Sequence, residues 1–99
     1  MIRRKIVTIS GSVRFWDKIQ EVSERLELEK KCVVLGMTPH VLDRELTESE
    51  RDLLGELHFA KIDLSDALFG VNPGGYIGES TRKEIEYAKS SGKEIIYLE

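Results

Sequence analysis

The residues best suited to chemistry lie in and after a glycine-rich stretch in the second half of the chain. Three of the five residues from 74 to 78 are glycines (Gly74, Gly75 and Gly78), and a helical pattern that carries Glu84 follows them. Glycine permits tight turns and lets a ligand approach the backbone closely. The start of a helix offers unpaired N–H groups and the positive end of the helix dipole. The stretch therefore predicts a loop that binds an anionic ligand.

A second candidate loop, Ser10-Gly11-Ser12-Val13-Arg14, follows the first apolar run of the chain. Gly11 permits a tight turn, Ser12 offers a hydroxyl and an N–H group, and the guanidinium of Arg14 matches a phosphate. The alternative is purely structural, with Ser12 as a helix cap and Arg14 as a surface charge. The loop is neither a G-x-G-x-x-G fingerprint nor a Walker A sequence. Together, the two loops point to a small nucleotide-binding site.

Glu84 has two interpretations. A carboxylate beside a sugar can attack the anomeric carbon and form a covalent glycosyl-enzyme. However, Thr81-Arg-Lys-Glu84 also has the spacing of a capping box, in which Glu84 would bond the backbone of Thr81. Spacing alone favours the cap and leaves the nucleophilic role open.

The remaining candidates surround these two loops. Asp66 stands just before an apolar run, where its carboxyl group could bond a base or a sugar, or simply lie in a polar turn. Tyr76 could flank a base or cover the backbone of its own loop. His40 and His58 fit no metal-ligand pattern, and we expect neither to be catalytic. The predicted catalytic residues are Glu84 and Asp66, and the predicted substrate-binding residues are Gly11, Ser12, Val13, Arg14, Asn72, Gly75, Tyr76, Gly78 and Ser80.

Four apolar runs predict strands that must position these loops, at residues 5–9, 32–35, 67–71 and 94–98. Apolar residues at helical spacing predict a first helix whose stripe runs from Phe15 to Leu26. A second helix begins at the capping-box sequence Thr47-Glu-Ser-Glu50 and ends before Asp66, with Leu53, Leu57, Ala60 and Leu64 as its apolar stripe. A third helix covers residues 80 to about 90, followed by Gly92 as its C′ residue. Residues 36 to 46 are predicted to form a loop.

Strands that alternate with helices imply a parallel sheet with right-handed crossovers. We expect one domain over residues 1–99, a small flavodoxin-like or Rossmann-like doubly wound sheet of four strands in the order 2-1-3-4. In such a sheet the ligand lies at the carboxyl ends of the strands, where the strand order reverses. That point lies between the first and third strands. Because the two candidate loops follow these strands, they should meet in space.

Composition and charge argue against several classes of function. A net charge of -3 argues against binding to nucleic-acid polymers, which requires a basic surface. The single cysteine excludes an internal disulfide and argues against a cysteine-based metal cluster. No apolar run approaches the ~20 residues of a membrane span, and the N-terminus lacks the apolar segment of a signal peptide. We expect a cytoplasmic protein with no metal and no cofactor. The small size favours a homo-oligomer, with a dimer expected.

Two stretches resemble a known family, the nucleoside 2-deoxyribosyltransferase superfamily with its deoxynucleoside 5′-monophosphate N-glycosidase branch. The sequence from Ile9 to Arg14 resembles the Gly-Ser-Ile-Arg segment with which that branch holds the substrate phosphate. The segments 65–71 and 80–88 resemble the family's Ala-Asp plus strand and its Glu-Leu-Gly-Tyr-Ala helix. The chain departs from that pattern at Glu86, which stands where the family has glycine, and in having four strands where relatives often have five.

This resemblance implies that Glu84 is the nucleophilic carboxylate and Asp66 an acidic residue in contact with the substrate. It also implies that Ser12 and Arg14 hold a 5′-phosphate, with Ser80 as the nearest further serine. The expected reaction is cleavage of an N-glycosidic bond or transfer of 2-deoxyribose. The substrate would be a nucleoside 5′-monophosphate or a deoxynucleoside. The alternative expectation is a non-catalytic nucleotide-binding module that uses the same loops.

Overall fold

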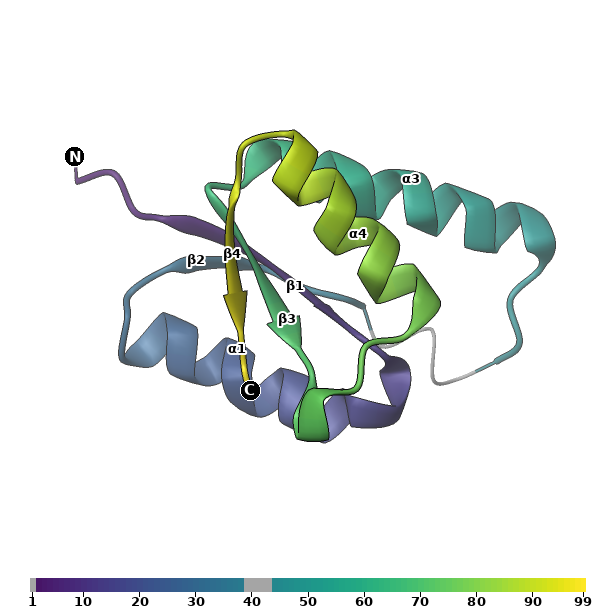
Figure 1. Cartoon of the computed structure of the whole chain (residues 1–99), viewed down its shortest axis with the longest axis horizontal. Coiled ribbons are helices and arrows are strands. Elements are labelled where there is room, and N and C mark those ends of the chain that lie inside the picture. The colour runs from purple at the N-terminus through teal and green to yellow at the C-terminus, as the bar shows by residue number, and fades with distance from the viewer. Residues whose placement is uncertain (1, 39–43) are drawn as a thin grey trace.

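The computed structural model of this chain describes residues 2–38 and 44–99. It has a four-stranded, all-parallel sheet in the order β2-β1-β3-β4 (Figure 1). The strands are β1 (Ile6–Gly11), β2 (Val33–Leu35), β3 (Ala67–Val71) and β4 (Glu94–Tyr97). The fold is therefore α/β and Rossmann-like, and the predicted strands and their order are confirmed.

Helices cover both faces of this sheet, as a doubly wound fold requires. On one face lies α1 (Trp16–Leu28), which follows a short 3-10 turn, η1 (Val13–Phe15). On the other face lie α3 (Glu48–Leu64) and α4 (Glu79–Ser90) (Figure 1). A second 3-10 turn, η2 (Pro73–Gly75), connects β3 to the segment before α4. The predicted helices are confirmed within about two residues at each end, which is the usual uncertainty of helix boundaries.

Side chains of β1 alternate between the two faces, and the two faces differ in character. Val7 and Ile9 are fully buried against α1, where they pack with Ile19 and its neighbours. Thr8 and Ser10 are equally buried but point to the other face, toward α3 and α4. Thr8 bonds the hydroxyl of Ser65 and the backbone of Lys61. The face of β1 beneath α3 is therefore polar, and it is this face that carries the site.

The predicted helix ends are confirmed where local sequence determines them. Thr47 and Glu50 form a reciprocal capping box, with Glu50 N to Thr47 Oγ1 at 3.1 Å and Thr47 N to a Glu50 carboxyl oxygen at 2.9 Å. At the end of α4, Gly92 has φ of +75°, and the N–H groups of Gly92 and Lys93 bond the carbonyls of Lys89 and Ala88. These bonds form a Schellman motif, which favours glycine at C′.

The apolar stripe of α3 does not face the sheet. Leu53, Leu57 and Leu64 are 53%, 47% and 69% exposed, whereas the buried residues of this helix are His58 and Ile62. The stripe correctly predicted a helix, but it does not mark the core-facing side of that helix. Ile62 packs with Leu68, Ile85 and Ala88, and this contact decides how α3 is rotated.

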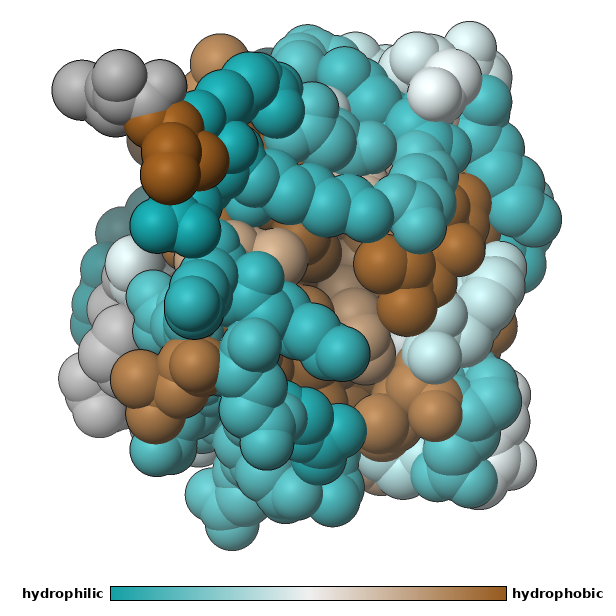
Figure 2. Space-filling model, turned by 90° about the vertical axis from the view of Figure 1, so that its left-hand side faces the viewer, coloured by the Kyte–Doolittle hydropathy of each residue, from teal (hydrophilic) through white to brown (hydrophobic). Residues whose placement is uncertain are grey.

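Figure 2 shows the side of the molecule that carries the N-terminus. It is mostly hydrophilic, with separate apolar patches. Ion pairs join the segment before β1 to residues near β3 and β4. Arg3 bonds Asp66, and Lys5 bonds Glu94. Basic residues at the start of the chain therefore connect neighbouring strands at the amino-terminal edge of the sheet. Within the described residues, no helix has the length and apolar character needed to cross a membrane.

Candidate active site at the carboxyl edge of the sheet

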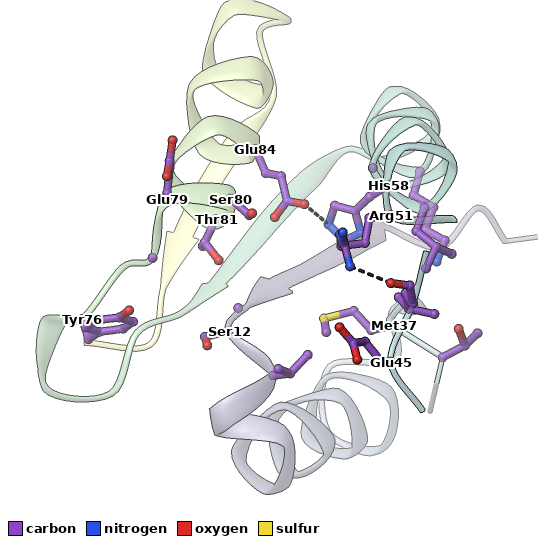
Figure 3. A pocket seen from close by; sticks show the side chains of 18 of the residues that line it. Ser12, Met37, Glu45, Arg51, His58, Tyr76, Glu79, Ser80, Thr81 and Glu84 are labelled. Carbon is purple, nitrogen blue, oxygen red and sulfur yellow. Dashed lines mark hydrogen bonds and ion pairs between the residues drawn. The ribbon is translucent and has the colours of Figure 1, made fainter. Parts of the chain in front are cut away.

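A cavity of about 720 Å³ lies at the carboxyl ends of the strands, a volume in the range of small-molecule sites. The segment after β1 and residues 37–38 after β2 line it, together with the inward side of α3 and the start of α4 (Figure 3). The two candidate loops therefore meet across one cavity, as the strand order predicts. The predicted residues that line it are Gly11, Ser12, Val13, Tyr76, Gly78, Ser80 and Glu84.

Glu84 stands in the second turn of α4, and its carboxyl group points away from the helix toward α3 (Figure 3). The side chain is only 17% exposed. Burial raises the pKa of this carboxyl from its ordinary 4.5 to about 7, while a hydrogen bond from Ser10 acts in the opposite direction. Burial disfavours the charged form because water no longer solvates it. Glu84 thus exchanges its proton near neutral pH, which is typical of functional carboxyl groups.

His58 is the nearest titratable neighbour of Glu84. Its Nε2 lies 3.4 Å from Oε2 of Glu84 and 3.0 Å from Oγ of Ser10. The side chain is 10% exposed. Burial, with a smaller contribution from the charge of Lys61, lowers the pKa of His58 from 6.5 to about 4. The imidazole is therefore neutral at physiological pH and can accept a proton at one nitrogen.

This cluster is not a serine-hydrolase triad. In such a triad the serine and the acid bond different nitrogens of the histidine. Here Ser10 and Glu84 both approach Nε2, so His58 cannot be oriented by Glu84 while it takes a proton from Ser10. The arrangement instead places one nitrogen opposite a buried carboxyl group.

The start of α4 presents unpaired backbone donors to the same cavity. Gly78 is the N-cap, and as a glycine it has no side chain that could cap the first turn. Thr81 lies inside that turn, so the alternative interpretation of Glu84 as part of a capping box with Thr81 is excluded, and Glu84 is not used as a cap. The Thr81 side chain is buried and has no hydrogen bond within the described part of the chain. Its hydroxyl points toward the side of the cavity where Ser12 lies (Figure 3).

Ser12 and Arg14 differ in where they lie. Ser12 lines the cavity, and its Oγ also accepts a weak bond of 3.4 Å from the backbone of Arg14. The guanidinium of Arg14 stacks over the ring of Tyr76, 4.5 Å from the ring centre. Arg14 therefore lies at the outer rim, beside Tyr76, and is not among the residues that line the cavity.

Three predicted site residues lie elsewhere. Asp66 precedes β3, so it sits at the amino edge of the sheet, where it accepts bonds from Arg3 and from the backbone of Ile6. The structure therefore does not place Asp66 at the cavity with Glu84, because the two ends of a parallel strand lie at opposite edges of the sheet. Asn72 is buried and bonds the backbone of Glu99. Gly75 supplies a positive φ of 82° in η2 and does not line the cavity.

Sequence reasoning missed His58 and Ser10. The leucines of α3 do not indicate which side of the helix is buried, because they point outward. Ile62 is the better guide, because His58 precedes it by four residues and so lies on the same side of the helix. Ser10 lies two residues after Thr8 on β1, which places both on the α3 side of the sheet. The alternation of β1 was therefore the available signal for Ser10.

The cations of the α3 wall are engaged with the protein. Arg44 bonds both carboxyl oxygens of Glu50, at 2.9 and 2.7 Å. Arg51 bonds the carbonyl of Leu46 at 2.6 Å, and Lys61 bonds that of Gly36 at 2.7 Å. Among the described residues, no group of three acidic, histidine or cysteine side chains is arranged to hold a metal ion. His40 and the other residues from 39 to 43 of the predicted loop lie outside the described residues.

Comparison with known proteins adds no family to this picture. No protein-family model matches the chain, and neither does any curated protein.

Proposed function

We propose that this protein cleaves the N-glycosidic bond of a nucleotide or nucleoside, with Glu84 as the nucleophile. The observation that carries the proposal is the position of the Glu84 carboxyl group. It is nearly buried, it caps no helix, and it faces a cavity of nucleotide size at the reversal point of the strand order. A carboxyl group in such a place can form a glycosyl ester.

In the proposed reaction, a carboxyl oxygen of Glu84 bonds C1′ of the sugar while the bond from C1′ to the base nitrogen breaks. The result is a glycosyl ester on Glu84 and a free base. Water then attacks C1′ and releases the sugar, which makes the protein an N-glycosidase. If a second base attacks C1′ instead, the same intermediate leads to 2-deoxyribosyl transfer.

The cavity also supports a substrate with a 5′-phosphate. The uncapped first turn of α4 and the hydroxyl of Thr81 lie across the cavity from Ser12. Unpaired N–H groups at a helix start, together with the helix dipole, favour phosphate binding. A phosphate held here would place the adjoining sugar beside Glu84, one turn further along the same helix. We therefore favour a (deoxy)nucleoside 5′-monophosphate over a free nucleoside.

The test is base release from a panel of nucleotides and nucleosides, with and without a free acceptor base, followed by chromatography. Glu84→Gln should reduce release on the order of a thousandfold or more, because it removes the nucleophile. Glu86→Gln is the matched control, since Glu86 lies on the same helix but is exposed and paired with Arg82.

Two results would contradict the proposal. Unchanged release by Glu84→Gln would exclude Glu84 as the nucleophile. No release from any substrate, with a nucleotide still raising the melting temperature, would identify a nucleotide-binding module without catalysis.

A further inference from the structure

The two nitrogens of His58 have different surroundings. Nε2 faces the carboxyl group of Glu84 and the hydroxyl of Ser10, at 3.4 and 3.0 Å. Nδ1 has no hydrogen bond within the described part of the chain. It is not sealed in the interior either, because every sealed side-chain nitrogen and oxygen there has a partner. His58 lines the cavity. Its Nε2 therefore meets Glu84, while its Nδ1 remains accessible for proton exchange with a ligand.

Cleavage of an N-glycosidic bond requires two proton transfers, and such a ring can perform both. Glu84 must lose a proton to attack, since burial keeps this carboxyl largely protonated below neutral pH. The base must gain a proton to depart as a neutral molecule. The nucleophile and the leaving base lie on opposite sides of C1′, so a group bonded only to Glu84 cannot serve both. A ring with one nitrogen on each side can.

We propose that His58 is a proton relay that carries the proton of Glu84 to the departing base. The proposal rests on the proposed glycosidic cleavage and names the group that assists the base. His58 receives the proton at Nε2 and donates another from Nδ1. Because the ring stays neutral throughout, the relay needs no buried cation, whose desolvation would be costly.

The first step balances as follows. The Oε2–H bond of Glu84 breaks and its proton bonds Nε2, while the other carboxyl oxygen bonds C1′. The bond from C1′ to the base breaks, its electron pair stays on the base, and the Nδ1 proton of His58 moves to the base. The products are a glycosyl ester, a neutral base, and His58 with its proton on Nε2.

The second step restores the starting state. Water bonds C1′, the ester bond to Glu84 breaks, and the proton of the water moves to Nδ1. The Nε2 proton returns to the carboxylate of Glu84. Ser10 can accept a bond from Nε2 while that nitrogen is protonated, which explains its position against the same nitrogen.

The neighbouring cations do not offer an alternative route for the proton. Lys61 and Arg51 are the other basic groups of α3 that line the cavity, and each donates to a backbone carbonyl. An arginine side chain does not release its proton in proteins. On α4 and β1, the polar groups that face the ring are Glu84 and Ser10. Among the described residues, His58 is therefore the group best placed to exchange a proton with both Glu84 and a ligand.

The relay is tested by substrates whose bases differ in their need for a proton. A purine nucleotide methylated at N7 releases a neutral base without protonation, whereas the unmethylated nucleotide does not. His58→Gln and His58→Asn preserve polar atoms near Nε2 and Nδ1 respectively, but neither amide can relay a proton. We expect both variants to lose about 100- to 10,000-fold on the unmethylated nucleotide and less than about tenfold on the methylated one. Glu56→Gln, on the exposed side of the same helix, is the control and should match the wild type.

An equal loss on both substrates would overturn the relay and leave His58 a purely structural role. The nucleophile is tested separately, since Glu84→Gln should lose activity on both substrates. If Glu84→Gln fails on both and His58→Gln is active on both, the proposed function stands and the relay falls. If Glu84→Gln remains active on both, the proposed function itself is overturned.

A measurement on the wild-type protein keeps the proposal testable if the His58 variants do not fold. Nitrogen-15 NMR distinguishes the two neutral tautomers and the charged form of an imidazole. The relay requires the neutral form with its proton on Nδ1 at pH 6, because Nε2 must accept from Glu84. A ring that is charged at pH 6, or protonated on Nε2, would refute the relay.

Discussion

Glu84→Gln replaces a buried carboxyl group by an amide of nearly the same shape, and the change should alter how stability depends on pH. Burial raises the pKa of Glu84 in the folded protein from 4.5 to about 7. Between these two values the unfolded chain has lost the proton of Glu84 while the folded protein retains it. Folding stability of the wild type therefore falls as pH rises through this window, and the loss is complete above pH 7.

The magnitude follows from the gap between the two pKa values. At about 1.4 kcal/mol per pH unit, the interval from 4.5 to about 7 corresponds to about 3 kcal/mol. Glutamine does not ionise and escapes this cost. The free energy of unfolding of Glu84→Gln, relative to the wild type, should therefore increase by about 3 kcal/mol between pH 4.5 and pH 8. For a domain of this size, that difference corresponds to a melting temperature higher by roughly 10–20 °C.

His58 contributes the opposite pH dependence of folding stability, so the stability curves of the wild type and Glu84→Gln should differ in shape. Burial lowers the pKa of His58 from 6.5 to about 4. Its contribution to stability is present above pH 6.5 and is lost as pH falls to about 4. In the wild type the two trends oppose each other between pH 4.5 and 6.5, so this pair causes little net change there. In Glu84→Gln only the His58 trend remains, so stability should rise from pH 4 to 6.5 and then level off.

Urea unfolding at intervals from pH 4 to 8.5 measures the pH dependence of the free energy of unfolding directly. The wild type, Glu84→Gln and Glu86→Gln should show equal slopes against urea, so that the midpoints report stability alone. Glu86 is exposed, and its variant should track the wild type at every pH. If the difference between Glu84→Gln and the wild type stays constant from pH 4.5 to 8, the carboxyl group is not held protonated by burial and our account of the site is refuted.

Two further predictions concern residues of the sheet, one at each of its edges. Asp66→Asn should leave base release unchanged, because Asp66 bonds Arg3 and Ile6 at the far edge of the sheet. Those partners lower the pKa of Asp66 from 3.8 to about 2. The contribution of Asp66 to folding stability is therefore lost as pH falls through this range. Acid unfolding of Asp66→Asn should lack this pH-dependent loss of stability. A loss of turnover like that of Glu84→Gln would contradict this placement. Gly11→Ala should cost about 1–3 kcal/mol in urea unfolding, since a Cβ there would lie 3.2 Å from both Ile19 Cδ1 and Val71 Cβ. Gly36→Ala is the control, because nothing lies within 4 Å of its Cβ position, and equal stability of the two variants would refute the packing argument.

The elements of the fold could be predicted because each depends on short-range pattern. Apolar runs such as Ala67–Val71 marked the strands, and the spacing of Thr47 and Glu50 marked the start of α3. Gly92 marked the end of α4 because few other residues adopt positive φ. The alternation of strands and helices then limited the topology to a parallel sheet. The strand order in turn located the cavity at the carboxyl edge, between the loops after β1 and β3.

The composition of the site was less predictable, because it depends on how helices are rotated against the sheet. The leucines of α3 have the spacing of a buried stripe, yet they are exposed, since Ile62 and not the leucines packs against β3 and α4. That rotation brings His58 to Glu84. The capping box at Thr81 and Glu84 had correct spacing as well, but α4 begins at Glu79, which leaves the carboxyl group of Glu84 free to face the cavity.

The sequence by itself thus determined the α/β architecture, the two loops that meet at one edge of the sheet, and Glu84 as the carboxyl group among them. The tertiary structure decided what Glu84 faces. Neighbours in sequence cannot bury a carboxyl group against a histidine 26 positions away. Only the packing of α3 and α4 on the polar face of β1 does so, and this burial raises the pKa of Glu84 and lowers that of His58, which favours the neutral form of both groups.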